Sequence, residues 1–133
     1  MKKVINWFEK NSDVSWIIVI GIMAIIFSLS SFGGLGTSSK GDLGIFSIIY
    51  HFFAFFFLNL FLLFSLVRGN RKEFILVAVI ISIFYGITDE FHQYFVPGRV
   101  SDFFDIMVNN VGVFFSTLFY MFFLRNNRLC PEF

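Results

Sequence analysis

Four uninterrupted apolar runs constrain the fold of this chain more than any other feature of its sequence. They extend near residues 14–32, 43–67, 74–91 and 103–124. A helix needs about 20 residues to cross the hydrocarbon core of a bilayer, and each run is close to that length. Strands of a membrane β-barrel are about half as long and alternate between apolar and polar residues, which these runs do not. The sequence therefore predicts an all-α, polytopic membrane protein with four transmembrane helices.

The overall composition excludes several other classes of protein. Of the 133 residues, 57% are hydrophobic and 23 are Phe, which is more apolar surface than a soluble domain of this size can bury. The net charge is +1, so no basic field predicts nucleic acid as a partner. Cys130 is the only cysteine, which excludes a disulfide framework and a cluster of thiolate zinc ligands. We interpret residues 1–133 as a single membrane domain.

The start of the chain has an alternative interpretation. Lys2 and Lys3 before an apolar run are typical of a secretory signal peptide, and Ser28-Leu29-Ser30 is weakly similar to a cleavage site. The apolar core of a signal peptide has about 7–15 residues, and this run is longer. We therefore expect the first span to be retained as a transmembrane helix.

The distribution of basic residues predicts how the spans are oriented. Cytoplasmic loops of membrane proteins carry an excess of Lys and Arg. Eight basic residues lie on one predicted side, and they are Lys2, Lys3, Lys10, Arg68, Arg71, Lys72, Arg125 and Arg128. Only Lys40 and Arg99 lie on the other. Both termini are therefore predicted to be cytoplasmic, with the loops at 33–42 and 92–102 facing outward and Cys130 a free thiol in a reducing compartment.

Residues 88–109 concentrate polar side chains in an otherwise apolar chain. They include Asp89, Glu90, His92, Gln93, Arg99, Asp102, Asp105 and Asn109. Charge within or beside a membrane span is costly and is rarely kept without a function. Glu90, Asp105 and Asn109 fall near the outer ends of their spans, and His51 falls roughly 12 Å into the second span at the helical rise per residue. Three helices are thus predicted to bring polar groups to one level of the outer leaflet.

Helical spacing places these groups on two predicted faces. One face has Ser82, Gly86, Glu90 and Gln93, and the other has Asp102, Asp105, Asn109, Gly112 and Ser116. Small residues four positions apart let helix backbones approach closely. An antiparallel register then predicts that Ser82 meets Ser116 and that Gly86 meets Gly112. In this register Glu90 lies opposite Asp105 and Asn109, in a polar pocket that opens outward.

Several of these residues also have purely structural interpretations. Asp102 can be the N-cap of the fourth helix, and Asp105 can stabilise its first turn. His51 can be a buried neutral histidine that is hydrogen-bonded to a carbonyl group. Arg99 is an exposed loop cation, a phosphate clamp or a partner of Glu90, since a guanidinium group binds oxyanions in a fork.

Four further polar residues are predicted to lie outside the pocket. Asn59, in the middle of the second span, is expected to form hydrogen bonds between helices. Asp89 lies about 100° around its helix from Glu90, so we expect a solvated carboxylate at headgroup level. His92 is expected at the membrane interface, and Asn110 near the helix cap or the lipid interface.

The polar residues also match a family pattern. The chain resembles the VanZ-like membrane proteins, whose signature combines an E-x-x-Q pair, a P-G-R turn and a D-x-x-x-N-x-x-G helix, with His-Phe early in the preceding span. The matching residues here are Glu90 and Gln93, Pro97-Gly98-Arg99, Asp105, Asn109 and Gly112, and His51-Phe52. The resemblance covers the last three spans. The family is named for a protein associated with resistance to teicoplanin-type glycopeptide antibiotics.

The resemblance implies a role in the bacterial cell envelope, for which we consider three functions. The first is an enzyme that acts on phospholipid or polyprenyl lipid headgroups in the outer leaflet. The second is a non-catalytic protein that binds a lipid or a lipoglycopeptide and alters access of the antibiotic to the surface. The third is transport of a lipid or an ion, which four short helices without an inverted repeat do not favour.

The expected site follows from the same residues. The expected catalytic residues are Glu90, His51 and Asp105, and the expected substrate-binding residues are Arg99, Gln93 and Asn109. Oxygen ligands from Glu90, Asp105 and Asn109 suit Mg²⁺ or Ca²⁺, while His51 or Glu90 can serve as a general base. The sequence leaves open whether a metal is bound and which oligomer forms.

Overall fold

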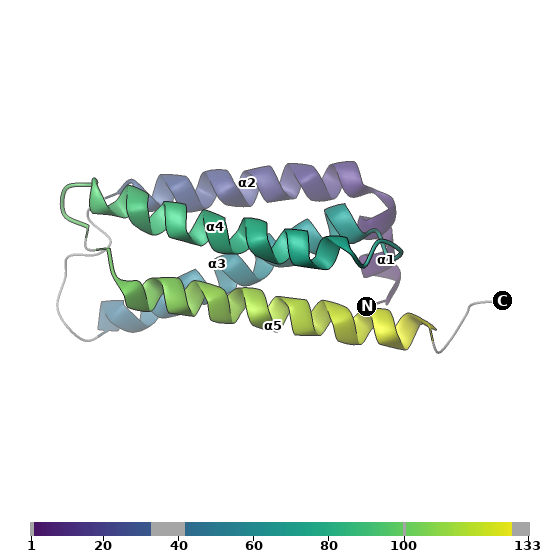
Figure 1. Ribbon diagram of the computed structural model, residues 1–133. Coiled ribbons are helices and arrows are strands. Elements are labelled where there is room, and N and C mark those ends of the chain that lie inside the picture. The colour runs from purple at the N-terminus through teal and green to yellow at the C-terminus, as the bar shows by residue number, and fades with distance from the viewer. Residues whose placement is uncertain (1, 33–41, 100, 129–133) are drawn as a thin grey trace.

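The chain is built from helices alone over the residues that the computed structural model describes. These are residues 2–32, 42–99 and 101–128, with side chains described for 3–32, 45–99 and 101–123. The helices are α1 (Lys2–Lys10), α2 (Ser12–Ser30), α3 (Asp42–Val67), α4 (Phe74–Tyr94) and α5 (Phe103–Arg128). The four longer helices run along a common bundle, and α1 lies at one end of it (Figure 1).

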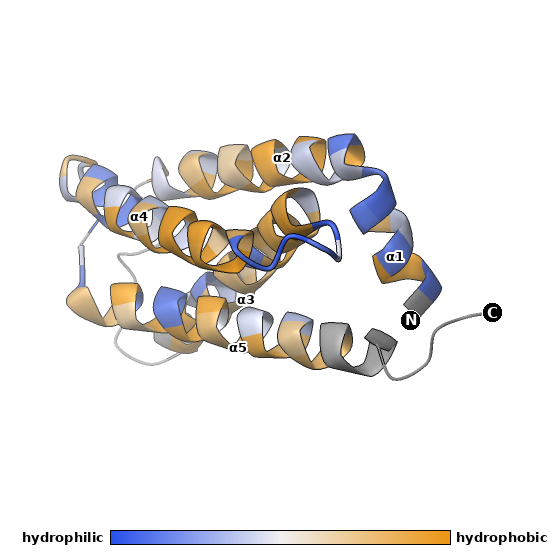
Figure 2. Ribbon diagram, turned by 45° about the vertical axis from the view of Figure 1, so that its right-hand side comes forward, coloured by the Kyte–Doolittle hydropathy of each residue, from blue (hydrophilic) through white to orange (hydrophobic). Residues whose placement is uncertain are grey.

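The four longer helices are long and apolar enough to span a membrane. The spanning segments are Ser12–Ser30, Ile45–Val67, Phe74–Tyr94 and Phe103–Phe123, within a few residues of the predicted runs. Their outer faces are hydrocarbon, with Ile17 and Phe46 each more than half exposed. Hydrophobic residues occupy the middle of the bundle, and hydrophilic residues gather at its ends (Figure 2). The chain is therefore a multi-pass membrane protein, as predicted.

The two ends of the bundle differ in which segments they carry. The α3–α4 turn and the C-terminal end of α5 lie at the same end as α1, and the α4–α5 turn lies at the opposite end (Figure 1). We call these the α1 end and the turn end. An even number of spans requires this arrangement. The predicted loop at 33–42 and the predicted free thiol of Cys130 lie outside the described residues, apart from the first residue of α3.

The charged start of the chain forms a short amphipathic helix that the sequence analysis did not predict. Ile5 is buried, and the Phe8 ring packs edge-on against Phe61 of α3 with ring centroids 5.2 Å apart. Lys3 and Lys10 are exposed. Apolar residues three apart on one face and lysines on the other explain why α1 folds back onto the bundle.

The predicted register between the third and fourth spans is wrong, because α3 occupies the position that α4 was expected to fill. A Cβ atom at Gly112 would collide with the carbonyl oxygen of Phe52 and lie 3.1 Å from the backbone nitrogen of Phe56, both in α3. Gly86 of α4 instead faces Asn109, whose Cβ lies 3.6 Å from a Cβ built at Gly86. Helical spacing identifies a face of small residues but not the helix that packs on it.

Asn59 joins α3, α4 and α5 in the middle of the bundle. The two hydrogens of its Nδ2 are shared among three acceptors, which are Ser116 Oγ at 2.6 Å, Thr117 Oγ1 at 2.9 Å and the Val113 carbonyl at 3.2 Å. Its Oδ1 accepts from Ser82 Oγ at 3.1 Å. The expected interhelical role of Asn59 is confirmed. The two serines that were predicted to meet are bridged by this amide instead.

Candidate functional site

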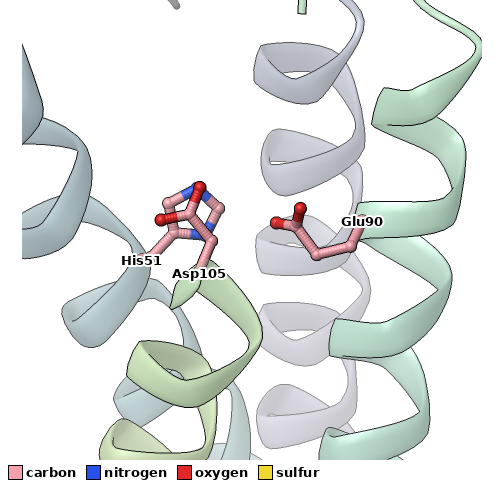
Figure 3. Close-up of side chains that lie close together, drawn as sticks. All are labelled: His51, Glu90 and Asp105. Atoms are coloured by element: carbon pink, nitrogen blue, oxygen red, sulfur yellow. The ribbon is translucent and has the colours of Figure 1, made fainter. Parts of the chain in front are cut away.

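Three side chains from three helices converge toward the turn end of the bundle. His51 of α3 and Asp105 of α5 lie together, and Glu90 of α4 points toward them (Figure 3). One ligand atom from each residue lies within 4.8 Å of the others. His51 and Glu90 are each 2% exposed, and the Asp105 side chain is 18% exposed. The structure thus brings together the three residues expected to be catalytic, and we call them the His51–Glu90–Asp105 cluster.

Asn109 orients the imidazole of His51. Its Oδ1 lies 3.0 Å from His51 Nδ1, and because an amide oxygen can only accept, this contact is a hydrogen bond in the tautomer that carries the proton on Nδ1. The other ring nitrogen, Nε2, is then left with its lone pair and lies 4.0 Å from Asp105 Oδ2. Asn109 was expected to bind substrate, but its oxygen is used within the protein, on the histidine.

The start of α5 holds the carboxylate of Glu90. The Asp102 backbone N–H donates to Glu90 Oε2 at 3.2 Å, and Gln93 Nε2 lies 3.4 Å from Glu90 Oε1. Asp102 Oδ1 also accepts from the Phe104 N–H at 2.9 Å, so the N-cap interpretation of Asp102 is confirmed. Asp105, three residues further on, faces the cluster as well as lying in the first turn.

Asp89 is part of the buried polar network, which corrects the expectation of a solvated carboxylate. It is 4% exposed, and its two oxygens accept from Ser30 Oγ at 2.6 Å and Gln93 Nε2 at 3.0 Å. The C-terminal end of α2 covers the face of α4 on which Asp89 lies. Gln93, expected to bind substrate, therefore links two carboxylates. Ser30, near the end of the first span, was the sequence feature that could have indicated a partner for Asp89. From the sequence, it was considered only as part of a weak cleavage site.

Arg99 fastens the α4–α5 turn onto α2. Its Nη2 donates to the Leu29 carbonyl at 2.6 Å, while its Nε is buried without a hydrogen-bond partner. The guanidinium interacts electrostatically with Asp105 and with Tyr50, whose hydroxyl is also buried and unpaired. Among the described side chains it forms no ion pair with Glu90. The exposed-cation and Glu90-partner interpretations are therefore wrong, and the phosphate clamp stays a prediction.

Two polar residues lie outside the cluster. His92 Nε2 lies 3.0 Å from Ser31 Oγ, and the ring stacks on Phe27 with centroids 4.6 Å apart. It is half-buried at the edge of the α2–α4 interface. Asn110 is also half-buried, beside the inward-facing Asn109.

Two apolar grooves flank α3 in the half of the helix that carries His51. One, of about 290 Å³, lies between α2 and α3 and is lined by residues that include Ile25, Tyr50 and Phe53. The other, of about 380 Å³, lies between α3 and α5 and includes Phe52 and Met107. Both linings are almost wholly hydrocarbon. Such grooves accommodate lipid chains and offer little to a water-soluble ligand.

Four spanning helices around a buried cluster of carboxylates and a histidine define a multi-pass membrane protein with an intramembrane polar site. The VanZ/LLP1 family model matches residues 14–124, and the chain belongs to this family. VanZ itself is associated with teicoplanin resistance. A search of curated proteins and a search of solved structures found no significant match.

Proposed function

We propose that the protein binds and acts on the phosphate-bearing headgroup of a membrane lipid, of the phospholipid or polyprenyl-phosphate type, at the His51–Glu90–Asp105 cluster. The observation that carries this proposal is the position of a buried polar cluster beside two hydrocarbon-lined grooves. A lipid has both a polar headgroup for such a cluster and chains for such grooves. In a bacterial plasma membrane this activity connects the protein to teicoplanin-type resistance.

The charge distribution supports an outward-facing site. The α1 end carries the eight basic residues of the predicted cytoplasmic side, and Arg99 is the described basic residue at the turn end. Positive residues favour the cytoplasmic side of a membrane. The cluster then opens toward the outer leaflet, in which lipid-anchored cell-wall precursors and lipoglycopeptides can reach it.

Two unpaired groups supply the expected contacts to phosphate. Arg99 Nε and the Tyr50 hydroxyl are both buried without partners, and Tyr50 lines the groove between α2 and α3. A guanidinium group and a phenol can donate to phosphate oxygens, and charge-assisted bonds of this kind are strong. His51 Nε2, with its free lone pair, or Glu90 would accept a proton from an attacking group.

A non-catalytic function is the alternative, in which the same pocket holds a lipid or a lipoglycopeptide and alters access of the antibiotic to the surface. One observation favours it. Gln93 Nε2 and Asn109 Oδ1 form their hydrogen bonds within the protein. The buried side-chain atoms without a partner among the described residues, which are Arg99 Nε, the Tyr50 hydroxyl and Asn109 Nδ2, are donors that can hold a ligand without any chemical step.

Lipid analysis of a strain that lacks the gene tests both functions. The strain is complemented with the wild-type gene, with Glu90→Gln or with Glu73→Gln, a matched control because Glu73 is exposed at the α3–α4 turn. Asp89→Asn is not a suitable control, because Asp89 is bonded to the same network. We expect the wild type and the control to restore teicoplanin tolerance and Glu90→Gln to fail at equal membrane abundance.

The lipid profile then separates the two functions. A headgroup-altered species that depends on Glu90 supports the enzyme, whereas lost tolerance with unchanged lipids supports binding alone. Full restoration of tolerance and lipid profile by Glu90→Gln contradicts both.

A further inference from the structure

The His51–Glu90–Asp105 cluster presents one nitrogen ligand and two carboxylates, a combination that differs from the all-oxygen set considered from the sequence. We propose that these three side chains bind one divalent transition-metal cation, of the Zn²⁺ or Mn²⁺ type. The site stands on its own residues and requires no lipid.

The nitrogen ligand is set up by the fold. His51 is 2% exposed, its ring lies in the cluster, and Asn109 Oδ1 holds the proton on Nδ1 (Figure 3). Among the described residues Nε2 has no hydrogen-bond partner, and Asp105 Oδ2 at 4.0 Å is beyond hydrogen-bond distance. A histidine that binds a metal through one ring nitrogen typically donates a hydrogen bond from its other ring N–H to an oxygen acceptor in this way.

The charge of the cluster calls for a cation. Glu90 is 2% exposed and Asp105 is partly buried, and their oxygens lie within 4.8 Å of one another and of the imidazole. Two buried carboxylates at this distance repel each other unless a cation or a proton compensates them. Arg99 interacts with Asp105 electrostatically, but among the described residues no lysine or arginine forms an ion pair with either carboxylate. A divalent ion bound with neutral His51 balances both charges.

The distances allow a metal after a small adjustment. Ligand atoms around a tetrahedral ion with bonds near 2.1 Å lie about 3.4 Å apart. The spread of 4.8 Å is wider by about 1.4 Å. The hydrogen bonds to Glu90 are long, at 3.2 and 3.4 Å, so its flexible side chain can move inward with little loss.

The ligand types select the class of ion. Mg²⁺ and Ca²⁺ prefer oxygen ligands alone. Imidazole suits Zn²⁺, and the two carboxylates also suit Mn²⁺. The Asn109 oxygen, which would have completed an all-oxygen set, is already bonded to His51. Three protein ligands leave coordination positions free for water or a phosphate oxygen, as catalytic metal sites do.

Metal titration of the full-length protein tests the site without any lipid substrate. The purified protein in nanodiscs is stripped with a chelator and titrated with MnCl₂ by calorimetry and electron paramagnetic resonance. We expect one equivalent to bind, with nitrogen coupling from one imidazole. His51→Gln should weaken binding by about tenfold or more and abolish that coupling, while His92→Gln, the matched control at the other histidine, should change neither.

A second variant covers a folding failure of His51→Gln. Asp105→Asn removes a carboxylate at the partly exposed edge of the cluster and should weaken binding by a similar factor while keeping the nitrogen coupling. Absence of binding, equal binding in all variants, or Ca²⁺-preferring binding without nitrogen coupling overturns the proposal. If the protein binds metal but Glu90→Gln still restores tolerance and the lipid profile, the lipid function is contradicted and the metal site is not. If Glu90→Gln fails to restore tolerance but the protein binds no metal, the metal site is contradicted and the lipid function is not.

Discussion

At the scale of single residues, glycine positions show how tightly the helices pack. A Cβ atom at Gly112 would strike the α3 backbone at the Phe52 carbonyl oxygen, and a helix backbone cannot yield locally. A Cβ atom at Gly86 meets the Phe55 ring edge at 3.2 Å, and a ring edge can shift by a few tenths of an ångström. Two glycines on predicted helix faces therefore differ in what they tolerate.

We expect Gly112→Ala to lower the free energy of unfolding by about 1–3 kcal/mol, the usual cost of overpacking, because α5 must move away from α3. Gly86→Ala should cost less. Gly21→Ala is the control, since nothing lies within 4 Å of a Cβ there. Unfolding titrations in mixed detergent micelles measure all three. Equal stability of the Gly112 and Gly21 variants would show that α5 does not pack on α3 in this register.

At the scale of elements, a half-buried carboxyl group couples α1 to the bundle. Glu9 Oε1 accepts a hydrogen bond from the Tyr120 hydroxyl of α5 at 2.5 Å. Burial raises the pKa of Glu9 above its ordinary value of 4.5, against the lowering effect of hydrogen bonds from Tyr120 and the Gly69 backbone. The folded protein therefore holds the proton more tightly than the unfolded chain does.

This shift predicts a pH dependence of α1 docking. The contribution of Glu9 is fully present below its unfolded pKa and is lost as the pH rises from 4.5 through the raised folded pKa. Glu9→Gln keeps an oxygen acceptor for Tyr120 but cannot ionise, so α1 should stay docked across this range. Hydrogen exchange of the α1 amides, corrected for intrinsic rates, measures the effect. Glu73→Gln is the control and should show the wild-type pH dependence. If Glu9→Gln shows the wild-type pH dependence as well, the coupling is contradicted.

At the scale of the whole molecule, the orientation of the bundle is the property to test. With the α1 end cytoplasmic, Asn70 in the α3–α4 turn should face the cell interior. Thr37 belongs to the loop that the sequence predicts to face outward. Single cysteines at these positions, in a Cys130→Ser background, are treated with a membrane-impermeant maleimide. Only the cysteine at 37 should react in intact cells, and both should react after lysis. Labelling of the cysteine at 70 from outside would reverse the orientation and place the cluster in the inner leaflet.

Local properties of the sequence were enough to predict the spans and the level of the polar groups. The length and hydropathy of a run decide whether it crosses a membrane, and the helical rise then places His51, Glu90 and Asp105 at similar depth. Periodicity also identified the buried face of α4 that includes Ser82, Gly86, Glu90 and Gln93. The short α1 was missed, because nine residues carry too weak a signal beside a transmembrane run.

Tertiary packing alone decided which faces meet. Gly112 lies against α3, although its spacing alone was compatible with α4. Asp89 is buried only because α2 covers it with Ser30. The free lone pair of His51 depends on an amide from α5, 58 residues away in the sequence. Helical period is set within one segment, whereas the neighbour of each face is set by how all the segments pack together, and at this site packing gives each polar residue its partner.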